Sequence, residues 1–180
     1  VATTGLSSVA LAESPLTSNV GMTSNYIWRG ATQANDEAAV SGGIDYAHGS
    51  GLYAGIWVSS LGGDSDTTDA DGSGQYEKDL YVGFGGEAGP RSYDVSYVQY
   101  MYPVTTAVEA DFAEVIVSLG YGPVTFTYAP TVDKEAAGSA QDDVYMSIAA
   151  EFEVKKDLNL GLTFGNYNFE DTATTDYSHY

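Results

Sequence analysis

The feature that most restricts the fold of this 180-residue chain is an alternation of apolar and polar residues with a period of two. A β-strand turns successive side chains to opposite faces, so this period predicts strands, and no stretch has a helical period. Clusters of Gly, Pro, Asp and Ser separate the segments, as in turns. The alternating segments lie at residues 18–31, 38–48, 51–60, 76–87, 92–102, 111–121, 124–130, 142–152, 158–169 and from about residue 176.

The two faces of these predicted strands have unequal chemistry. One face has large aliphatic and aromatic residues, and the other has Gly, Ser, Thr, Tyr and a few charged residues. A soluble sandwich would place Lys and Glu on its solvent face, but lysine is nearly absent from these segments. A polar face of small residues suits the interior of a narrow barrel whose apolar face contacts lipid. A soluble all-β domain is the alternative.

The connections between the segments alternate between short and long. The short ones lie near 48–51, 88–91, 122–123 and 153–157. Outer-membrane barrels have the same arrangement, with tight turns at one end and longer loops at the other. The predicted fold is therefore all-β, an antiparallel up-and-down meander that forms an outer-membrane-type β-barrel. We expect about 10–12 strands in the complete protein. Nine complete segments and part of a tenth cannot close as an even-stranded barrel, so either C-terminal strands are missing from this chain or the expectation of closure is wrong.

Composition excludes several functional classes. With 25 acidic and six basic residues the net charge is −19, which disfavours nucleic acid as a partner and attracts cations. The chain has no cysteine, so thiol catalysis, disulfides and cysteine-ligated metals are excluded. Its two histidines, His48 and His179, form no plausible triad or metal pair, and we expect no enzyme activity and no cofactor.

The first residues resemble the end of a secretory signal peptide. Small and apolar residues lead to Ala10-Leu11-Ala12, an A-x-A cleavage pattern. Residues 1–12 are interpreted as the remainder of a signal peptide or as a flexible tail, and residues 13–180 as a single β-barrel domain. Export to the outer membrane of a Gram-negative cell is expected, with the cell surface or extracellular space as the alternative.

Three stretches resemble a known family. NVGMTSNYIWRGATQ, GGIDYAHGSGLYAGIWVSSL and KDLYVGFGGEAGPRSYDVSYVQYMYP follow one another in this order. Together they are similar to the TorF-family porins of proteobacteria, and the similarity extends from about Ser18 to about Tyr180. The resemblance implies an outer-membrane β-barrel of porin type and says little about mechanism.

Counting positions along each strand predicts which charged residues face the interior. Arg29 falls on the polar face of the first segment, whereas Tyr26 and Trp28 fall on the apolar face and are expected to point outward. The residues predicted to line a pore are Arg29, Asp45, Asp79, Asp94, Glu114 and Asp143. Asp79, Glu114 and Asp143 would lie near one mouth, and Asp45 and Asp94 near the other. We expect Arg29 to contact Asp79, Glu114 or Asp45; a salt-bridged interior plug without permeation is the alternative to an open constriction.

The loop GGDSDTTDADGSGQYE has a weak calcium signature. Asp69, Asp71 and Ser73 match the first half of a calcium-binding loop, but Leu80 stands where the final Glu would be. A weak calcium site at the surface and a solvated loop are the two interpretations.

These observations predict an outer-membrane porin-like channel that passes small solutes passively and favours cations. Its expected partners are outer-membrane lipid and small solutes or cations, without nucleic acid, and an oligomer is compatible with the sequence. The alternative is a β-rich surface or assembly subunit, forming filaments and having no transport role.

Overall fold

The structure, a computed structural model, describes residues 15–62, 76–103, 111–134, 143–170 and 175–180. Most of these residues lie in β-strands, and none lies in a helix, so the predicted all-β class is confirmed. No described segment is therefore a helix suited to crossing a membrane.

Ten strands form one antiparallel sheet, and a small hairpin is inserted between the first two of them. The strands of the sheet are β1 (Leu16–Thr23), β4 (Ala39–Ala47), β5 (Leu52–Ser60), β6 (Tyr76–Ala88), β7 (Arg91–Met101), β8 (Phe112–Tyr121), β9 (Val124–Lys134), β10 (Val144–Lys155), β11 (Leu158–Asn168) and β12 (Tyr177–His179). The hairpin consists of β2 (Ile27–Trp28) and β3 (Ala31–Thr32). Every strand of the sheet overlaps one predicted segment, and the hairpin falls mostly within the remainder of the first segment, 18–31.

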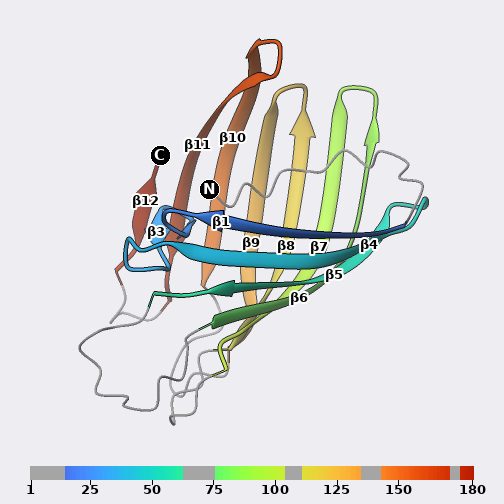
Figure 1. Ribbon diagram of the computed structural model, residues 1–180. Coiled ribbons are helices and arrows are strands. Elements are labelled where there is room, and N and C mark those ends of the chain that lie inside the picture. Colours follow the sequence, from blue (N-terminus) through green and yellow to red (C-terminus); the bar gives the residue numbers. More distant parts are fainter. Residues whose placement is uncertain (1–14, 63–75, 104–110, 135–142, 171–174) are drawn as a thin grey trace, which may run out of the picture.

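The sheet is strongly curled. Figure 1 shows β1, β4, β5 and β6 crossing in front of β7 to β11, so one face of the sheet is concave and encloses an interior. Each strand pairs with its neighbours in sheet order, which confirms the antiparallel meander. Among the described residues β1 pairs only with β4 and β12 only with β11, so the sheet is not closed into a barrel.

The connections alternate in length as predicted. Short turns join β4 to β5, β6 to β7, β8 to β9 and β10 to β11. The last three of these turns lie at the same end of the sheet in Figure 1. We call the end with residues 48–51, 89–90, 122–123 and 156–157 the turn end, and the opposite end, near Ser60, Tyr76 and Phe112, the loop end.

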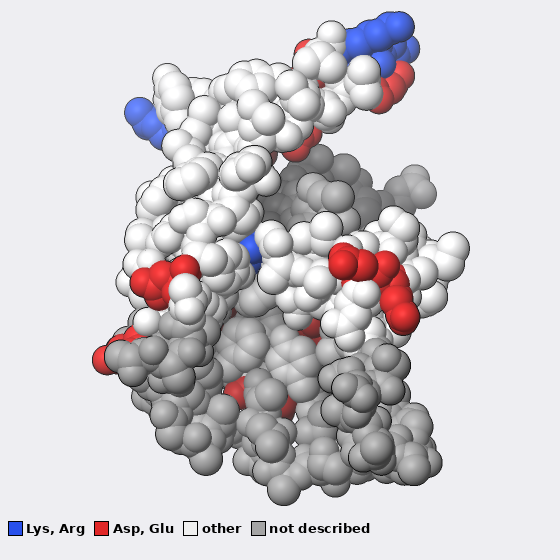
Figure 2. Space-filling model, turned by 90° about the vertical axis from the view of Figure 1, so that its left-hand side faces the viewer, with Lys and Arg blue, Asp and Glu red and all other residues white. Residues whose placement is uncertain are grey.

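The convex face of the sheet is apolar. Large side chains at alternate positions are exposed there, including Val20 (83%), Leu119 (57%) and Leu162 (59%). The strand register aligns them across neighbours, with Leu119 between Tyr93 and Phe126. Figure 2 shows one side of the molecule, on which uncharged side chains cover most of the described surface and acidic groups form separate patches.

The concave face is built by tyrosines that lie over glycines. Tyr53 pairs with Gly83, and Gly55 pairs with Tyr81, on adjacent strands β5 and β6. A Cβ atom at either glycine would overlap the ring of the opposite tyrosine. The ring can therefore lie across the strand and reach an acceptor: Tyr53 donates to Asp94 Oδ2 at 2.8 Å, and Tyr81 donates to Asp45. Glycines on the polar face thus make room for tyrosine–carboxylate hydrogen bonds.

The first predicted strand, 18–31, is wrong beyond Thr23. The chain leaves the sheet there, and Ile27–Thr32 fold back as the β2–β3 hairpin. Arg29 and Gly30 have φ of 47° and 81°, and positive φ at both central residues is the pattern of a tight type I′ turn. A strand cannot continue through these angles, which ends the period-two pattern.

The predicted outward direction of Tyr26 and Trp28 is also wrong. Tyr26 is 5% exposed and packs edge to face against Trp57, with a centroid distance of 5.4 Å. Trp28 packs against Tyr100 and Tyr167 at 5.7 and 6.1 Å. Because the hairpin lies on the concave side of the sheet, both aromatic residues of the face predicted to point outward find aromatic partners inside.

Substituting Gly83 by Ala tests the tyrosine-over-glycine arrangement. The methyl group would displace the Tyr53 ring and break its hydrogen bonds to Asp94, so we expect a loss of about 1–3 kcal/mol in the free energy of unfolding. Gly161→Ala is the control, because no atom lies within 4 Å of the added Cβ. Denaturant unfolding measures both variants. Equal stability of the two would contradict the proposed packing.

Candidate functional site

A buried ion pair joins the hairpin to the sheet. Arg29 lies in the β2–β3 turn, and Glu114 lies near the loop end of β8. The guanidinium donates through Nη1 to Oε1 and through Nη2 to Oε2, each at 2.7 Å. The two side chains are 8% and 0% exposed. This bidentate geometry is the strong form of an Arg–carboxylate pair, and it confirms Glu114 among the three expected partners of Arg29.

Aromatic rings surround the same ion pair. The Arg29 Cζ atom lies 4.2 Å from the Trp28 ring centroid and 4.1 Å from that of Tyr145. The hydroxyls of Tyr100 and Tyr167 donate to Glu114 at 3.3 and 3.4 Å, so the carboxylate has further donors. Ring faces attract cations, which offsets part of the desolvation of the guanidinium.

The protonation state of Arg29 follows from its surroundings. Burial alone lowers the pKa of Arg29, but the charge and hydrogen bonds of Glu114 raise it further than burial lowers it. The net pKa of Arg29 is raised, and the guanidinium stays charged. The pair therefore has no net charge, although it lies in the interior of a strongly acidic chain.

The hairpin spans the interior between distant strands. On one side Tyr26 packs on Trp57 of β5 and donates from its hydroxyl to Glu77 Oε1 of β6 at 3.2 Å. On the other side Trp28 and Arg29 contact residues of β7, β8, β10 and β11. A Cβ atom at Gly30 would overlap His179 of β12. The β2–β3 hairpin is thus a crosspiece within the curl of the sheet.

The remaining predicted pore residues make separate contacts. At the turn end, Asp45 and Asp94 accept hydrogen bonds from Tyr81 and Tyr53. Near the loop end, Asp143 is 2% exposed and accepts from the Glu170 N–H at 3.0 Å. Asp79 is 8% exposed in β6. The strand register separates these carboxylates into the two groups that their positions along the strands predict. Of the three expected partners of Arg29, Glu114 is the one that contacts it.

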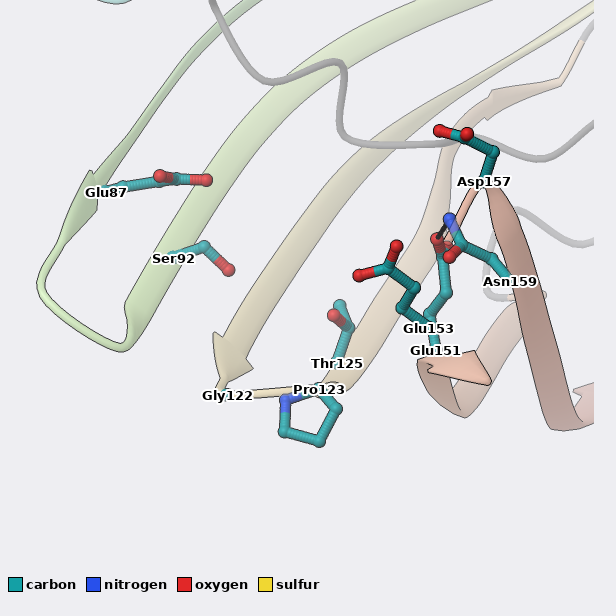
Figure 3. A pocket seen from close by; sticks show the side chains of 9 residues that line it. All are labelled: Glu87, Ser92, Gly122, Pro123, Thr125, Glu151, Glu153, Asp157 and Asn159. Carbon is teal, nitrogen blue, oxygen red and sulfur yellow. Dashed lines mark hydrogen bonds between the residues drawn. The ribbon is translucent and has the colours of Figure 1, made fainter. Parts of the chain in front are cut away.

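A polar pocket opens at the turn end of the sheet (Figure 3). Its volume is about 550 Å³. The lining residues are Glu87, Ser92, Gly122, Pro123, Thr125, Glu151, Glu153, Asp157 and Asn159. Asn159 donates to Glu151 at 3.0 Å, as the dashed line in Figure 3 marks. Four carboxylates thus line this pocket.

Sequence reasoning missed three parts of this interior. The pocket carboxylates Glu87, Glu151 and Glu153 lie at alternate strand positions that face the concave side. Extending the count of alternate positions to the ends of the strands would have found them. Glu77 has the same parity as Asp79 and lies two residues before it. The role of Tyr26 had no signal, because the apparent strand continues through it.

The calcium prediction at Asp69, Asp71 and Ser73 lies outside the described residues. Within the described ranges no group of three or more His, Asp and Glu side chains is arranged to hold a metal ion. The predicted signal peptide or tail at residues 1–12 also lies outside them.

Residues 9–180 match a family described as bacterial protein of unknown function (Gcw_chp). Because the match covers nearly the whole chain, the protein belongs to this family. The description names neither TorF nor a porin. No curated protein and no solved structure matches the chain.

Replacing Arg29 by Ala tests the ion pair. The change leaves Glu114 buried and without its charged partner, and we expect the free energy of unfolding to fall by about 3–5 kcal/mol. Adding Glu114→Gln to Arg29→Ala removes the uncompensated charge and should recover part of this loss. Arg91→Ala, at an exposed position of β7, should stay within about 0.5 kcal/mol of wild type. Denaturant unfolding gives all three values, and a double variant that is no more stable than Arg29→Ala would count against the direct pairing.

Proposed function

We propose that this protein is an outer-membrane β-barrel of the TorF porin kind that passes small solutes and favours cations. One observation carries the proposal: the curled sheet has an exposed apolar convex face and a concave face lined by carboxylates and hydroxyls. The two faces suit hydrocarbon outside and an aqueous, acidic interior.

Lipid is the proposed occupant of the convex face. Moving a large apolar side chain out of water contributes about 1.5–3 kcal/mol, and such side chains recur along every long strand. A monomeric soluble protein rarely exposes so continuous an apolar surface. β6 and β10 have 13 and 12 residues, more than the roughly 9–11 that a tilted strand needs to cross a bilayer. In this proposal β1 and the end of the meander close the barrel in the membrane.

Cation preference follows from the charges of the interior. Arg29 is the basic residue of the crosspiece, and Glu114 neutralises it. The carboxylates of the turn-end pocket have no comparable basic partner among the described residues of its lining. The net charge of −19 has the same sign. A negative potential at the opening concentrates cations and repels anions.

The hairpin narrows the passage in this proposal. It lies across the concave side and contacts β5 and β6 at Tyr26 and β8 at Arg29. Solutes must pass beside it, which limits them to small sizes. A constriction made by a folded-in segment differs from a fully open pore, and we expect low conductance.

A β-rich assembly subunit is the second candidate function. It is favoured by the two outer strands of the sheet, because β1 and β12 each have one neighbouring strand within the described residues. Such edges can pair with another chain. Partition into the aqueous phase without detergent, or regular filaments in the electron microscope, would support this second candidate. Heat-modifiable migration of a detergent extract on gels would support the closed barrel.

Reconstitution into planar bilayers tests the channel proposal. We expect small conductance steps and a reversal potential in a salt gradient that indicates cation preference. The absence of steps, or anion preference, would refute the proposed function.

The turn-end pocket supplies a variant for the same measurement. Replacing Glu87, Glu151 and Glu153 together by Gln removes three negative charges from the opening, so the cation-to-anion permeability ratio should fall by roughly several-fold. Glu37→Gln, an exposed acid outside the pocket, is the matched control and should leave the ratio unchanged. An unchanged ratio in the triple variant would show that the pocket is not on the path of the ions.

A further inference from the structure

Two carboxyl groups lie side by side in the interior near the loop end. Glu77 and Asp79 are two residues apart on β6, so they share the concave face, with Lys78 between them on the convex side. Glu77 is 2% exposed and Asp79 is 8% exposed. They lie opposite Ser59 and Trp57 of β5, and Asp79 also lies opposite Tyr100 of β7.

Each of these carboxyl groups has a buried oxygen without a hydrogen-bond partner. Glu77 Oε2 and Asp79 Oδ1 are both in this state, whereas Glu77 Oε1 accepts from the Tyr26 hydroxyl at 3.2 Å. Alternate residues of a strand project from the same face, so the two carboxyl groups are neighbours, and they interact electrostatically. Buried hydrogen-bond acceptors almost always have a donor in native proteins. Two neighbouring carboxyl oxygens without one therefore indicate a missing donor between them.

No basic group among the described residues supplies that donor. The titratable groups that interact with the pair are the tyrosines Tyr26, Tyr81, Tyr100 and Tyr102. The guanidinium of Arg29 donates to Glu114 through both Nη1 and Nη2. The surroundings of the pair are therefore neutral or acidic.

Two adjacent ionised carboxylates without a counter-ion are strongly unfavourable in a buried site, and one of them then keeps its proton. A hydrated metal ion needs space next to its ligand oxygens, but these two oxygens are buried from solvent. A proton needs no such space, and a protonated carboxyl group is a donor to its neighbour.

We propose that Glu77 and Asp79 form a proton-binding site in which the two carboxyl groups share one proton at neutral pH. The proton joins the two carboxyl oxygens that lack a donor, leaves one negative charge on the pair and keeps the Tyr26 hydroxyl bonded to Glu77. This inference concerns the folded chain and does not depend on conductance.

Loss of the shared proton has a defined consequence. At alkaline pH the pair gains a second buried negative charge directly beneath the hairpin. The stabilising arrangement is present in the protonated form and is lost as the pH rises and the proton leaves. We therefore expect the attachment of Tyr26 to β6 to weaken on the alkaline side.

Infrared spectroscopy of the folded protein, titrated from about pH 5 to about pH 10, tests the site. At about pH 7 the spectrum should contain a carboxylic-acid C=O band equivalent to one protonated group per chain. This band should disappear as the pH is raised toward about 10. Glu77→Gln keeps the shape of the side chain and can donate to Asp79, so this variant should lose that band at neutral pH. Glu151→Gln, an exposed acid of the turn-end pocket, should retain it.

The amide I band of each variant reports whether the sheet is intact. If Glu77→Gln fails to fold, the wild-type titration alone decides the question. A wild-type protein with no carboxylic-acid band at neutral pH would overturn the proposal, as would a folded Glu77→Gln protein with an undiminished band. A lack of conductance would count against the proposed channel and leave the proton site unaffected.

Discussion

The interior of this protein depends on a buried bidentate ion pair between Arg29 and Glu114. Removing two charges from water costs several kcal/mol for each ion, so the pair requires excellent geometry and further partners. Two hydrogen bonds of 2.7 Å, tyrosine donors to the carboxylate and aromatic faces on the guanidinium meet that requirement. Because Arg29 lies at the tip of a hairpin, the same contacts hold a segment of the chain across the sheet.

The rest of the architecture provides the space for this crosspiece. Glycines at Gly55 and Gly83 let tyrosine rings lie flat along the concave wall, where they reach Asp45 and Asp94. These tyrosines and carboxylates are thereby bonded to each other, and the large aliphatic side chains remain on the convex face. A sheet with this distribution has its polar face inside and its apolar face outside. That inversion is the basis for proposing a membrane protein with an acidic passage narrowed by the hairpin.

The strands were predictable because the environment of each face restricts every second residue along the chain. The same rule failed at residues 24–33, where Tyr26 and Trp28 continue the alternation although the chain has left the sheet. The Arg29–Gly30 turn was the local signal, and tertiary contacts with the opposite wall decided the outcome. Counting alternate positions along the strands placed Glu114 among three candidate partners of Arg29, but the choice among them depends on where the hairpin folds. Family membership adds no function, since the family is described as one of unknown function.

The assignment of inside and outside is most directly tested by the accessibility of tryptophan to lipid. The chain has two tryptophans, Trp28 and Trp57, and both pack against interior aromatic residues. In bilayers containing brominated lipids, wild-type fluorescence should be quenched weakly, whereas a variant with Phe126→Trp on the convex face should gain a strongly quenched component. Strong quenching of the wild-type protein, or no quenching of the added tryptophan, would contradict the account.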